Sequence, residues 1–301
     1  MDKHALIEPL RDPEYLIQII SNTTSVPAHT VRERLEEEFR QAGTNISRAI
    51  QAAGIPPYVW SDQLVEFYQT TDAFLYASIT WNRNRLKLAM RDWIHRKLST
   101  LGDVPLRILM YGDGTGFDSF FFAQVGHDVT YLETSFFASN IAKQLFAEAD
   151  LRIRIIEDLQ ESADEPFDVV ICLDVLEHVP HPESMVADLA RVLRDDGHLF
   201  VHAPFWYIHP CVPTHLKIHR SYSGTWRRLY GRAGLNPIDA RLLWNPLVLK
   251  KGPRALAASD RGFSARLRIV IGGILLRAVR FFPWPLTWTA ARLRATGDVA
   301  R

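Results

Sequence analysis

The sequence predicts an α/β fold in which an open, mostly parallel sheet follows an all-helical block and precedes a basic amphipathic tail. Two observations predict the sheet. Arg107 to Tyr111 is a short, mostly apolar run that continues into three alternating glycines, and a helical stretch and a second apolar run ending in an acid come next. With 47% hydrophobic residues, 301 residues suffice for one large or two modest cores.

Residues 1–104 are predicted to contain helices only. Asp12 followed by Pro13 is typical of a helix start, because aspartate caps backbone N–H groups and proline suits the first helical position. A second helix is predicted from Pro27 to Gly43, and others from Ile46 to Ala53, from Ser61 or Asp62 through Leu75, and from about Leu86 to Gly102.

This block either packs on the sheet and stabilises it, or forms a lid over a site. The lid hypothesis rests on more aromatic rings than one amphipathic face needs, because such rings exclude water and attract a cation. The rings are Tyr58, Trp60, Phe67, Tyr68, Tyr76 and Trp81.

The glycine-rich turn predicts a nucleoside cofactor site. Gly112, Gly114 and Gly116 follow the first strand, where glycine permits a sharp turn and close approach of a ligand. Glu133 comes 17 residues after Gly116, at the expected end of the neighbouring strand, where a carboxylate can accept hydrogen bonds from two ribose hydroxyls. A dinucleotide fingerprint would need its third glycine one position later, where Phe117 stands, so a cofactor without phosphates fits better.

A second segment gives the chain a family resemblance. It runs from Phe167 to Val179, FDVVICLDVLEHV, and is followed by the turn Asp195-Asp196-Gly197 into the strand His198 to Ala203. Together with the glycine turn, it resembles the class I S-adenosylmethionine-dependent methyltransferases, and its motifs are closest to the ubiquinone-pathway O-methyltransferase type. The resemblance covers about residues 105–250.

The resemblance implies a Rossmann-like, seven-stranded sheet of order 3-2-1-4-5-7-6, with S-adenosyl-L-methionine bound across the carboxyl ends of the strands. Asp158 would accept a hydrogen bond from the adenine amino group, although a helix cap is the alternative role for this acid. The cofactor contacts it implies are Tyr111, Gly112, Asp113, Gly114, Gly116, Asp118, Glu133, Thr134, Asp158, Leu159, Leu173 and Asp174.

The chain departs from the family at one position. Met110 stands two residues before the first glycine, where family members usually carry an acid that helps to hold the glycine loop and the methionine amino group. If the cofactor is the expected one, another residue takes over this role. Asp113 and Asp118 are the candidates.

Methyl transfer to oxygen or nitrogen requires alignment of the two reacting atoms and removal of a proton. Histidine suits proton removal because its ordinary pKa is near neutrality. His178, directly after the fourth strand, matches a histidine that lies near the acceptor in the ubiquinone-pathway type, and Glu177 would orient it. The alternative is that His178 only supports the structure.

The segment from Phe205 to Ser223 is predicted to overhang the site. Its candidate acceptor contacts are Tyr207, His209, His215 and Tyr222. The segment also contains Cys211 and His219, but one cysteine and three histidines lack the paired spacing of a structural zinc site. We therefore predict no metal.

The bulk composition indicates a cytoplasmic protein. Cys172 and Cys211 lie far apart, so a disulfide framework is not expected, and the first 16 residues resemble no secretory signal. A net charge of +1 argues against nucleic-acid binding.

Charge is concentrated in the tail. Residues 252–301 hold nine arginines and two aspartates, which is 9 − 2 = +7 and leaves +1 − 7 = −6 for the first 251 residues. Its apolar blocks alternate with arginines, and no uncharged run approaches the roughly 20 residues of a membrane span. Three roles remain open: an interfacial anchor with Trp284 and Trp288 at the boundary, a homodimer surface, or an ordinary packed helix.

The sequence thus predicts a helical cap (1–104), a cofactor-binding domain (105–251) and a basic tail (252–301). The leading function is methyl transfer from S-adenosyl-L-methionine to the oxygen or nitrogen of a small-molecule acceptor. One alternative is cyclisation of the cofactor's own aminobutyryl arm with release of methylthioadenosine, motivated by the cap and by Met110. Another is a catalytically silent binding or scaffold protein.

Overall fold

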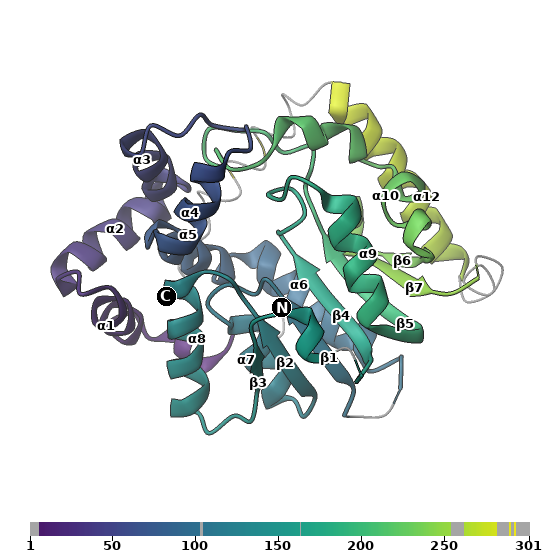
Figure 1. Ribbon diagram of the computed structural model, residues 1–301, viewed down its shortest axis with the longest axis horizontal. Coiled ribbons are helices and arrows are strands. Elements are labelled where there is room, and N and C mark those ends of the chain that lie inside the picture. The colour runs from purple at the N-terminus through teal and green to yellow at the C-terminus, as the bar shows by residue number, and fades with distance from the viewer. Residues whose placement is uncertain are drawn as a thin grey trace.

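A seven-stranded sheet forms the centre of the fold in the computed structural model (Figure 1), which describes residues 6–102, 105–162, 164–253 and 262–281, with 289 and 292. The strand order is β3-β2-β1-β4-β5-β7-β6, which confirms the predicted order. Only β7 runs antiparallel to its neighbours. The strands are β1 Arg107–Tyr111, β2 Asp128–Leu132, β3 Arg154–Ile156, β4 Phe167–Leu173, β5 Leu193–His202, β6 Leu235–Ala240 and β7 Leu247–Lys251.

Alternate strand residues serve two separate hydrophobic cores. In β1, Ile108 and Met110 belong to one core and Leu109 to the other, because successive side chains of a strand point to opposite faces. The first face is covered by α7 (Phe117–Gln124), α8 (Phe136–Glu148) and the N-terminal helices. The second is covered by α9 (Pro182–Val192), α10 (Trp226–Leu229) and α12 (Phe263–Phe281).

The described part of the N-terminal block is helical, as predicted. After a short 3-10 turn, Glu8–Arg11, the Asp12 carboxylate accepts hydrogen bonds from the backbone N–H groups of Glu14 and Tyr15 and so caps the first helix. The helices are α1 Pro13–Thr24, α2 Ala28–Arg40, α3 Thr44–Ala52, α4 Asp62–Thr70, α5 Ala73–Asn82 and α6 Arg85–Leu98.

Two boundaries in this block differ from the prediction. The expected single helix from Ser61 through Leu75 is two helices, because the chain is extended at Thr71 between α4 and α5. Gly43 caps the start of α3 instead of ending α2. A Cβ at Gly43 would lie 2.0 Å from the carbonyl oxygen of Cys211, so glycine is required here by a close approach of two distant segments.

The helical block shares its core with the sheet. Leu16, Tyr76 and Ile94 from the block belong to the same buried cluster as Ile108 and Phe122 from the sheet domain. Figure 1 shows the block along one side of the sheet and above the ends of its strands. The block is therefore a packed layer, whatever else it does at the site.

Four 3-10 turns complete the sheet domain. Among the described helices, none combines the length and apolarity needed to cross a bilayer. The expected boundary aromatics Trp284 and Trp288 lie outside the described residues. The turns are η3 Leu159–Ser162, η4 Lys217–Tyr222, η5 Gly231–Ala233 and η6 Leu242–Trp244.

Candidate active site

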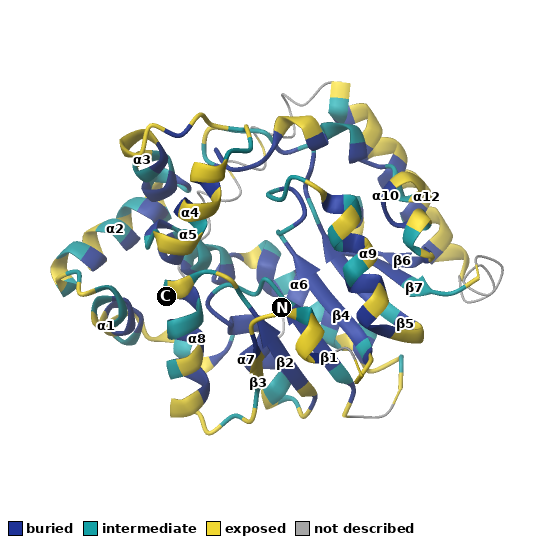
Figure 2. Ribbon diagram, in the orientation of Figure 1, coloured by how far each residue is buried: buried dark blue, intermediate teal, exposed yellow. Residues whose placement is uncertain are grey.

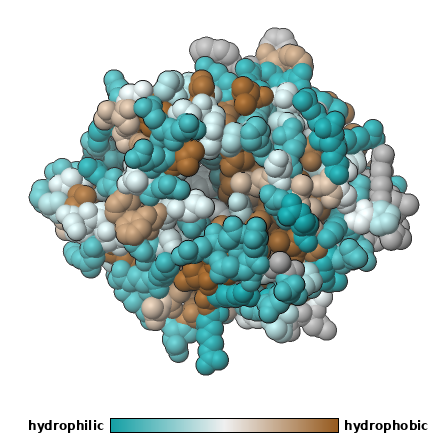
Figure 3. Space-filling model, viewed as in Figure 1, coloured by the Kyte–Doolittle hydropathy of each residue, from teal (hydrophilic) through white to brown (hydrophobic). Residues whose placement is uncertain are grey.

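A cavity of about 490 Å³ lies where the carboxyl ends of β1 and β4 meet the N-terminal helices and the segment after β5. Figure 3 shows a hollow near the middle of this face of the molecule. The predicted residues that line it are Tyr111, Gly112, Asp113, Gly114, Asp118, Glu133, Thr134, Leu173, Asp174, His178 and His215.

The three loop glycines have different surroundings. All have positive φ, which favours glycine. An added Cβ would lie 2.6 Å from the Val175 side chain at Gly112 and 2.7 Å from Phe146 at Gly116, so these two glycines serve packing. At Gly114 the nearest listed neighbour would be Ser78 Oγ at 3.6 Å. Gly114 is therefore the glycine that keeps room for a ligand.

Glu133 fastens the glycine loop to the end of β2. Its Oε2 accepts a hydrogen bond from Gly114 N at 2.8 Å, and its Oε1 accepts from the backbone N–H groups of Thr134 and Ser135. Burial raises its pKa, and these hydrogen bonds counteract the rise. A carboxylate has about four lone-pair sites, so acceptor capacity remains for a ribose.

The two candidates for the acid missing at Met110 have different environments. Asp118 lies 2.6 Å from Lys87 Nζ and 2.5 Å from Arg91 Nε. Burial opposes its ionisation, but these two cations outweigh burial and lower its pKa. Asp113 Oδ2 instead accepts from the N–H and hydroxyl of Ser119, and burial, followed by repulsion from Asp118, raises the pKa of Asp113 to about 7. Asp113 is thus the loop carboxylate that the cap does not neutralise.

Cap residues reach the site in a way that was not predicted. Lys87 and Arg91 of α6 hold Asp118, and Ser78 of α5 bonds with Thr115 of the glycine loop at 2.8 Å. Their sequence signal is weak: charged residues among the apolar positions of α6, which local periodicity assigns to solvent. Of the expected lid aromatics, Trp60, Tyr68 and Trp81 line the cavity, together with Phe74.

Asp174, at the end of β4, joins the cap to β5. Its Oδ2 accepts a hydrogen bond from Trp81 Nε1 at 2.9 Å, and its Oδ1 lies 2.7 Å from His202 Nδ1. Its φ is +60°, a conformation that is uncommon for a residue with a side chain. Such geometry is found where the surrounding structure fixes a functional position.

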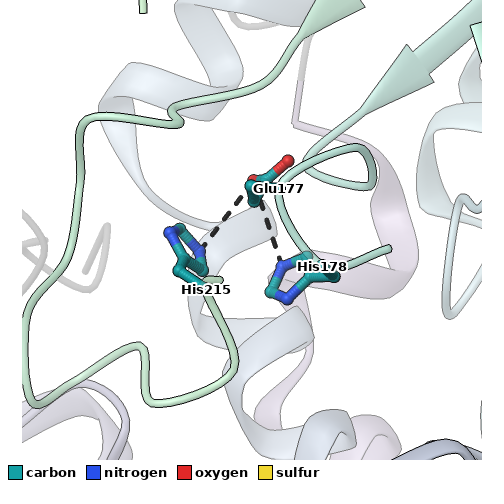
Figure 4. A group of neighbouring side chains, drawn as sticks. All are labelled: Glu177, His178 and His215. Carbon is teal, nitrogen blue, oxygen red and sulfur yellow. Dashed lines mark ion pairs between the residues drawn. The ribbon is translucent and has the colours of Figure 1, made fainter. Parts of the chain in front are cut away.

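Glu177, His178 and His215 converge beside the cavity (Figure 4). Glu177 is 1% exposed, and its Oε1 lies 3.9 Å from Nε2 of both histidines. His215 Nδ1 donates to the carbonyl of Tyr207 at 2.7 Å, and His178 Nδ1 lies 2.9 Å from the hydroxyl of Tyr68. Each imidazole is therefore oriented through Nδ1 with Nε2 near the carboxylate.

This trio also has the donor set of a metal site. Its three ligand atoms lie within 4.8 Å of one another, and two imidazoles with one carboxylate suit a divalent transition metal. The histidines first considered for zinc do not join it: His219 Nε2 bonds with Val179 O, and His209 stacks on Tyr207. The spacing that argued against a structural zinc site did not reveal this trio, because Glu177 and His215 are far apart in sequence.

Several predicted residues do not line the cavity. Glu177, Tyr207 and His209 lie behind it, the first as a buried neighbour of the two histidines and the others beneath His215. Asp158 Oδ1 accepts from Gln160 N and caps η3, as its alternative role required, and its adenine contact remains a prediction. The others outside the lining are Gly116 and Leu159.

The strand order, the alternating glycine loop after β1 and the acid at the end of β2 define the class of the sheet domain: a class I methyltransferase fold with a nucleoside site. Residues 109–201 match the family described as "Methyltransferase domain". This stretch is therefore a class I S-adenosylmethionine-dependent methyltransferase domain.

Curated relatives carry names consistent with this family. The chain is 35% identical over 114 residues to a ubiquinone biosynthesis O-methyltransferase of Dechloromonas aromatica, covering 36% of this chain and 48% of the relative. It is 34% identical to the protein of the same name from Xylella fastidiosa, covering 36% and 45%. The chain thus spans about half the length of the curated relatives it matches.

Among solved structures, the chain is similar to magnesium protoporphyrin IX methyltransferase from Synechocystis with bound S-adenosylmethionine. The two share 19% identity with a TM-score of 0.46, over 64% of this chain and 99% of the other.

Proposed function

We propose that this protein transfers a methyl group from S-adenosyl-L-methionine to an oxygen or nitrogen atom of a small-molecule acceptor. The observation that carries the proposal is a single cavity lined by the glycine loop and Glu133 and also by His178 and His215. Cofactor groups and proton-accepting groups thus share one space, as an in-line displacement requires.

The cofactor-binding residues of this proposal are those of the loop and of β2. Glu133 would bind the ribose hydroxyls, Gly114 would leave space for the methionyl part, and Asp113 would bind its ammonium group. S-adenosyl-L-methionine supplies an activated methyl group on a positively charged sulfur. Trp60, Tyr68 and Trp81 line the cavity and support water exclusion around that charge.

His178 is the proposed general base. With Nδ1 oriented by Tyr68, its Nε2 would accept the acceptor's proton, and the buried Glu177 carboxylate would stabilise the imidazolium that forms. Burial raises the pKa of Tyr68, so its hydroxyl stays protonated and keeps the ring in place. His215, Tyr207 and His209 complete the proposed acceptor side.

The test is product analysis with O-acceptors first, because the curated relatives are named O-methyltransferases. The protein is incubated with S-adenosyl-L-methionine and a panel of phenols, catechols and amines, and the products are separated by mass spectrometry. We expect S-adenosylhomocysteine together with a methylated acceptor. Methylthioadenosine would indicate cyclisation, and calorimetry without heat for either cofactor form would indicate a silent scaffold.

The proposal includes the organisation of the whole chain as a cap (1–104), a cofactor-binding domain (105–251) and a tail (252–301). It also includes a cytoplasmic location and a tail that contacts a membrane or a second copy. The exposed apolar side of α12 supports a contact surface in the tail.

A further inference from the structure

Helix α12 is apolar on both of its sides. Its inner side packs on the sheet domain: Ile269, Leu276 and Val279 are buried, and Gly272 and Gly273 lie against the ring of Trp244. Its outer side carries seven large hydrophobic residues, each between 42% and 84% exposed: Phe263, Leu267, Val270, Ile271, Ile274, Leu275 and Phe281. Figure 2 shows exposed residues along the outer side of α12.

The seven residues form one stripe. Counted from Phe263 they stand at +4, +7, +8, +11, +12 and +18, and these positions share one face of a helix with 3.6 residues per turn. The stripe runs the whole length of α12. Scattered exposed hydrophobic residues are ordinary on a protein surface, but a continuous stripe indicates a contact.

Arginines border this stripe, and no acid interrupts it. Residues 263–281 contain four arginines and no aspartate or glutamate. At 100° per residue, Arg266 and Arg277 lie along one border and Arg268 along the other. Further exposed residues on the adjoining η4 and α10 have the same character: Lys217, Ile218, Arg227 and Arg228.

We propose that α12 docks on an anionic lipid surface, lying in its plane with the apolar stripe in the interface and the arginines at the head groups. The charge distribution favours lipid over a second copy of this chain. A two-fold contact through the stripe would bring the arginine borders of two copies together, and α12 offers no carboxylate to pair with them.

The docked helix would be coupled to the cavity wall. Arg220 donates to the carbonyl of Arg280, and Arg280 donates to the carbonyl of Ser221, so the end of α12 is tied to η4. η4 begins two residues after His215, which lines the cavity. Docking would therefore place the acceptor side of the cavity near the lipid, although docking itself does not depend on the proposed methyl transfer.

The experiment is vesicle flotation of the full chain with phosphatidylcholine alone and with phosphatidylcholine containing phosphatidylglycerol. We expect flotation with the anionic vesicles, little with the neutral ones, and weaker flotation at high salt, because salt screens exposed charges over about 10 Å at 0.1 M. Equal flotation with both lipids, or none with either, would overturn the proposal.

A matched pair of variants isolates the stripe. Val270→Asp with Ile274→Asp places two charges on residues that are 56% and 52% exposed, and Val59→Asp with Phe136→Asp does the same at residues that are 56% and 62% exposed elsewhere. We expect the stripe variant to lose anionic-vesicle binding by about tenfold or more and the control to retain it, with unchanged thermal unfolding in both. Equal binding by both variants would overturn the proposal. So would a lipid-free dimer that the stripe variant dissociates, because a second copy would then cover α12.

Discussion

Single residues at the cavity combine two tasks, and Glu133 is the clearest case. Its carboxylate holds Gly114 N in place and, in the proposed function, also receives the ribose. The sequence could predict that an acid ends β2, because strand periodicity and spacing place it there. It could not predict the bond to Gly114, which depends on how the loop folds back over β2.

Glu133→Ala should weaken binding of S-adenosyl-L-methionine and of S-adenosylhomocysteine by about 1.5 to 3 kcal/mol, because charge-assisted hydrogen bonds are removed. Isothermal titration calorimetry measures this loss. Glu157→Ala, an exposed acid at the end of β3, is the matched control and should bind normally. Wild-type affinity in the Glu133 variant would refute the ribose assignment.

His178→Ala should lower turnover by roughly 10² to 10⁴ while leaving cofactor affinity nearly intact, because a general base acts on the acceptor. Steady-state rates and calorimetry together test this split. His181→Ala, an exposed histidine three residues away, should keep its activity. A loss below threefold in the His178 variant would move the proton acceptor to His215.

A chelator gives a second check on the same residue. If Nε2 of His178 is the base, incubation with EDTA should leave the rate unchanged. A rate that falls with EDTA and returns with a divalent cation would show instead that Glu177, His178 and His215 hold a metal.

Asp113→Asn should change how stability depends on pH. The pKa of Asp113 is raised to about 7 in the folded protein, above its ordinary value of 3.8, so the folded state binds the extra proton between about pH 4 and 7. Wild-type stability from this group therefore declines as pH rises through that window. Denaturant unfolding from pH 4 to 8 should show the variant gaining on the wild type as pH increases, and a constant difference would contradict the assignment.

At the scale of elements, the sheet followed from the sequence because each strand carries a strong local signal. Apolar runs, glycine turns and caps such as Asp12 and Ser61 are read from neighbouring residues. The links that build the site were beyond this kind of inference. Arg91 to Asp118 and Trp81 to Asp174 join residues 27 and 93 positions apart, and no local pattern specifies such pairs.

Two alanine variants in the glycine loop should separate packing from binding. Both positions have positive φ, so each substitution costs about 1 kcal/mol in backbone strain. Gly116→Ala should destabilise the fold by about 1 to 3 kcal/mol more, because its Cβ meets Ala142 and Phe146 at 2.8 and 2.7 Å. Gly114→Ala should mainly weaken cofactor binding. Urea unfolding and calorimetry measure the two effects, and equal loss of stability would contradict this division.

At the scale of the whole molecule, the helical block and the sheet form one cooperative structure. They share a hydrophobic core, and α6 places Arg91, a fully buried cation, on Asp118 beside the glycine loop. Removing one partner of such a pair strands a buried charge, which typically costs 3 to 5 kcal/mol. The block is thus part of the cofactor side of the cavity as well as a layer on the sheet.

The described domains should therefore unfold in a single transition. Differential scanning calorimetry of the full chain should give one peak with equal calorimetric and van't Hoff enthalpies. A fragment of residues 105–301 should fail to fold or to bind the cofactor, because Ile108, Phe120 and Phe122 lose the layer that covers them. Two resolved transitions, or a fragment that binds normally, would show that the block is an independent lid.

The two cysteines give the protein a built-in chemical reporter. Neither is in a disulfide; Cys172 is fully buried in β4, and burial raises the pKa of its thiol. Cys211 lines the cavity, next to the hydroxyl of Tyr207. Because the thiolate is the form that reacts, an alkylating reagent should label Cys211 and spare Cys172. The rate of labelling then measures occupancy of the cavity, so unknown acceptors can be screened by the protection they give, without any assay of turnover.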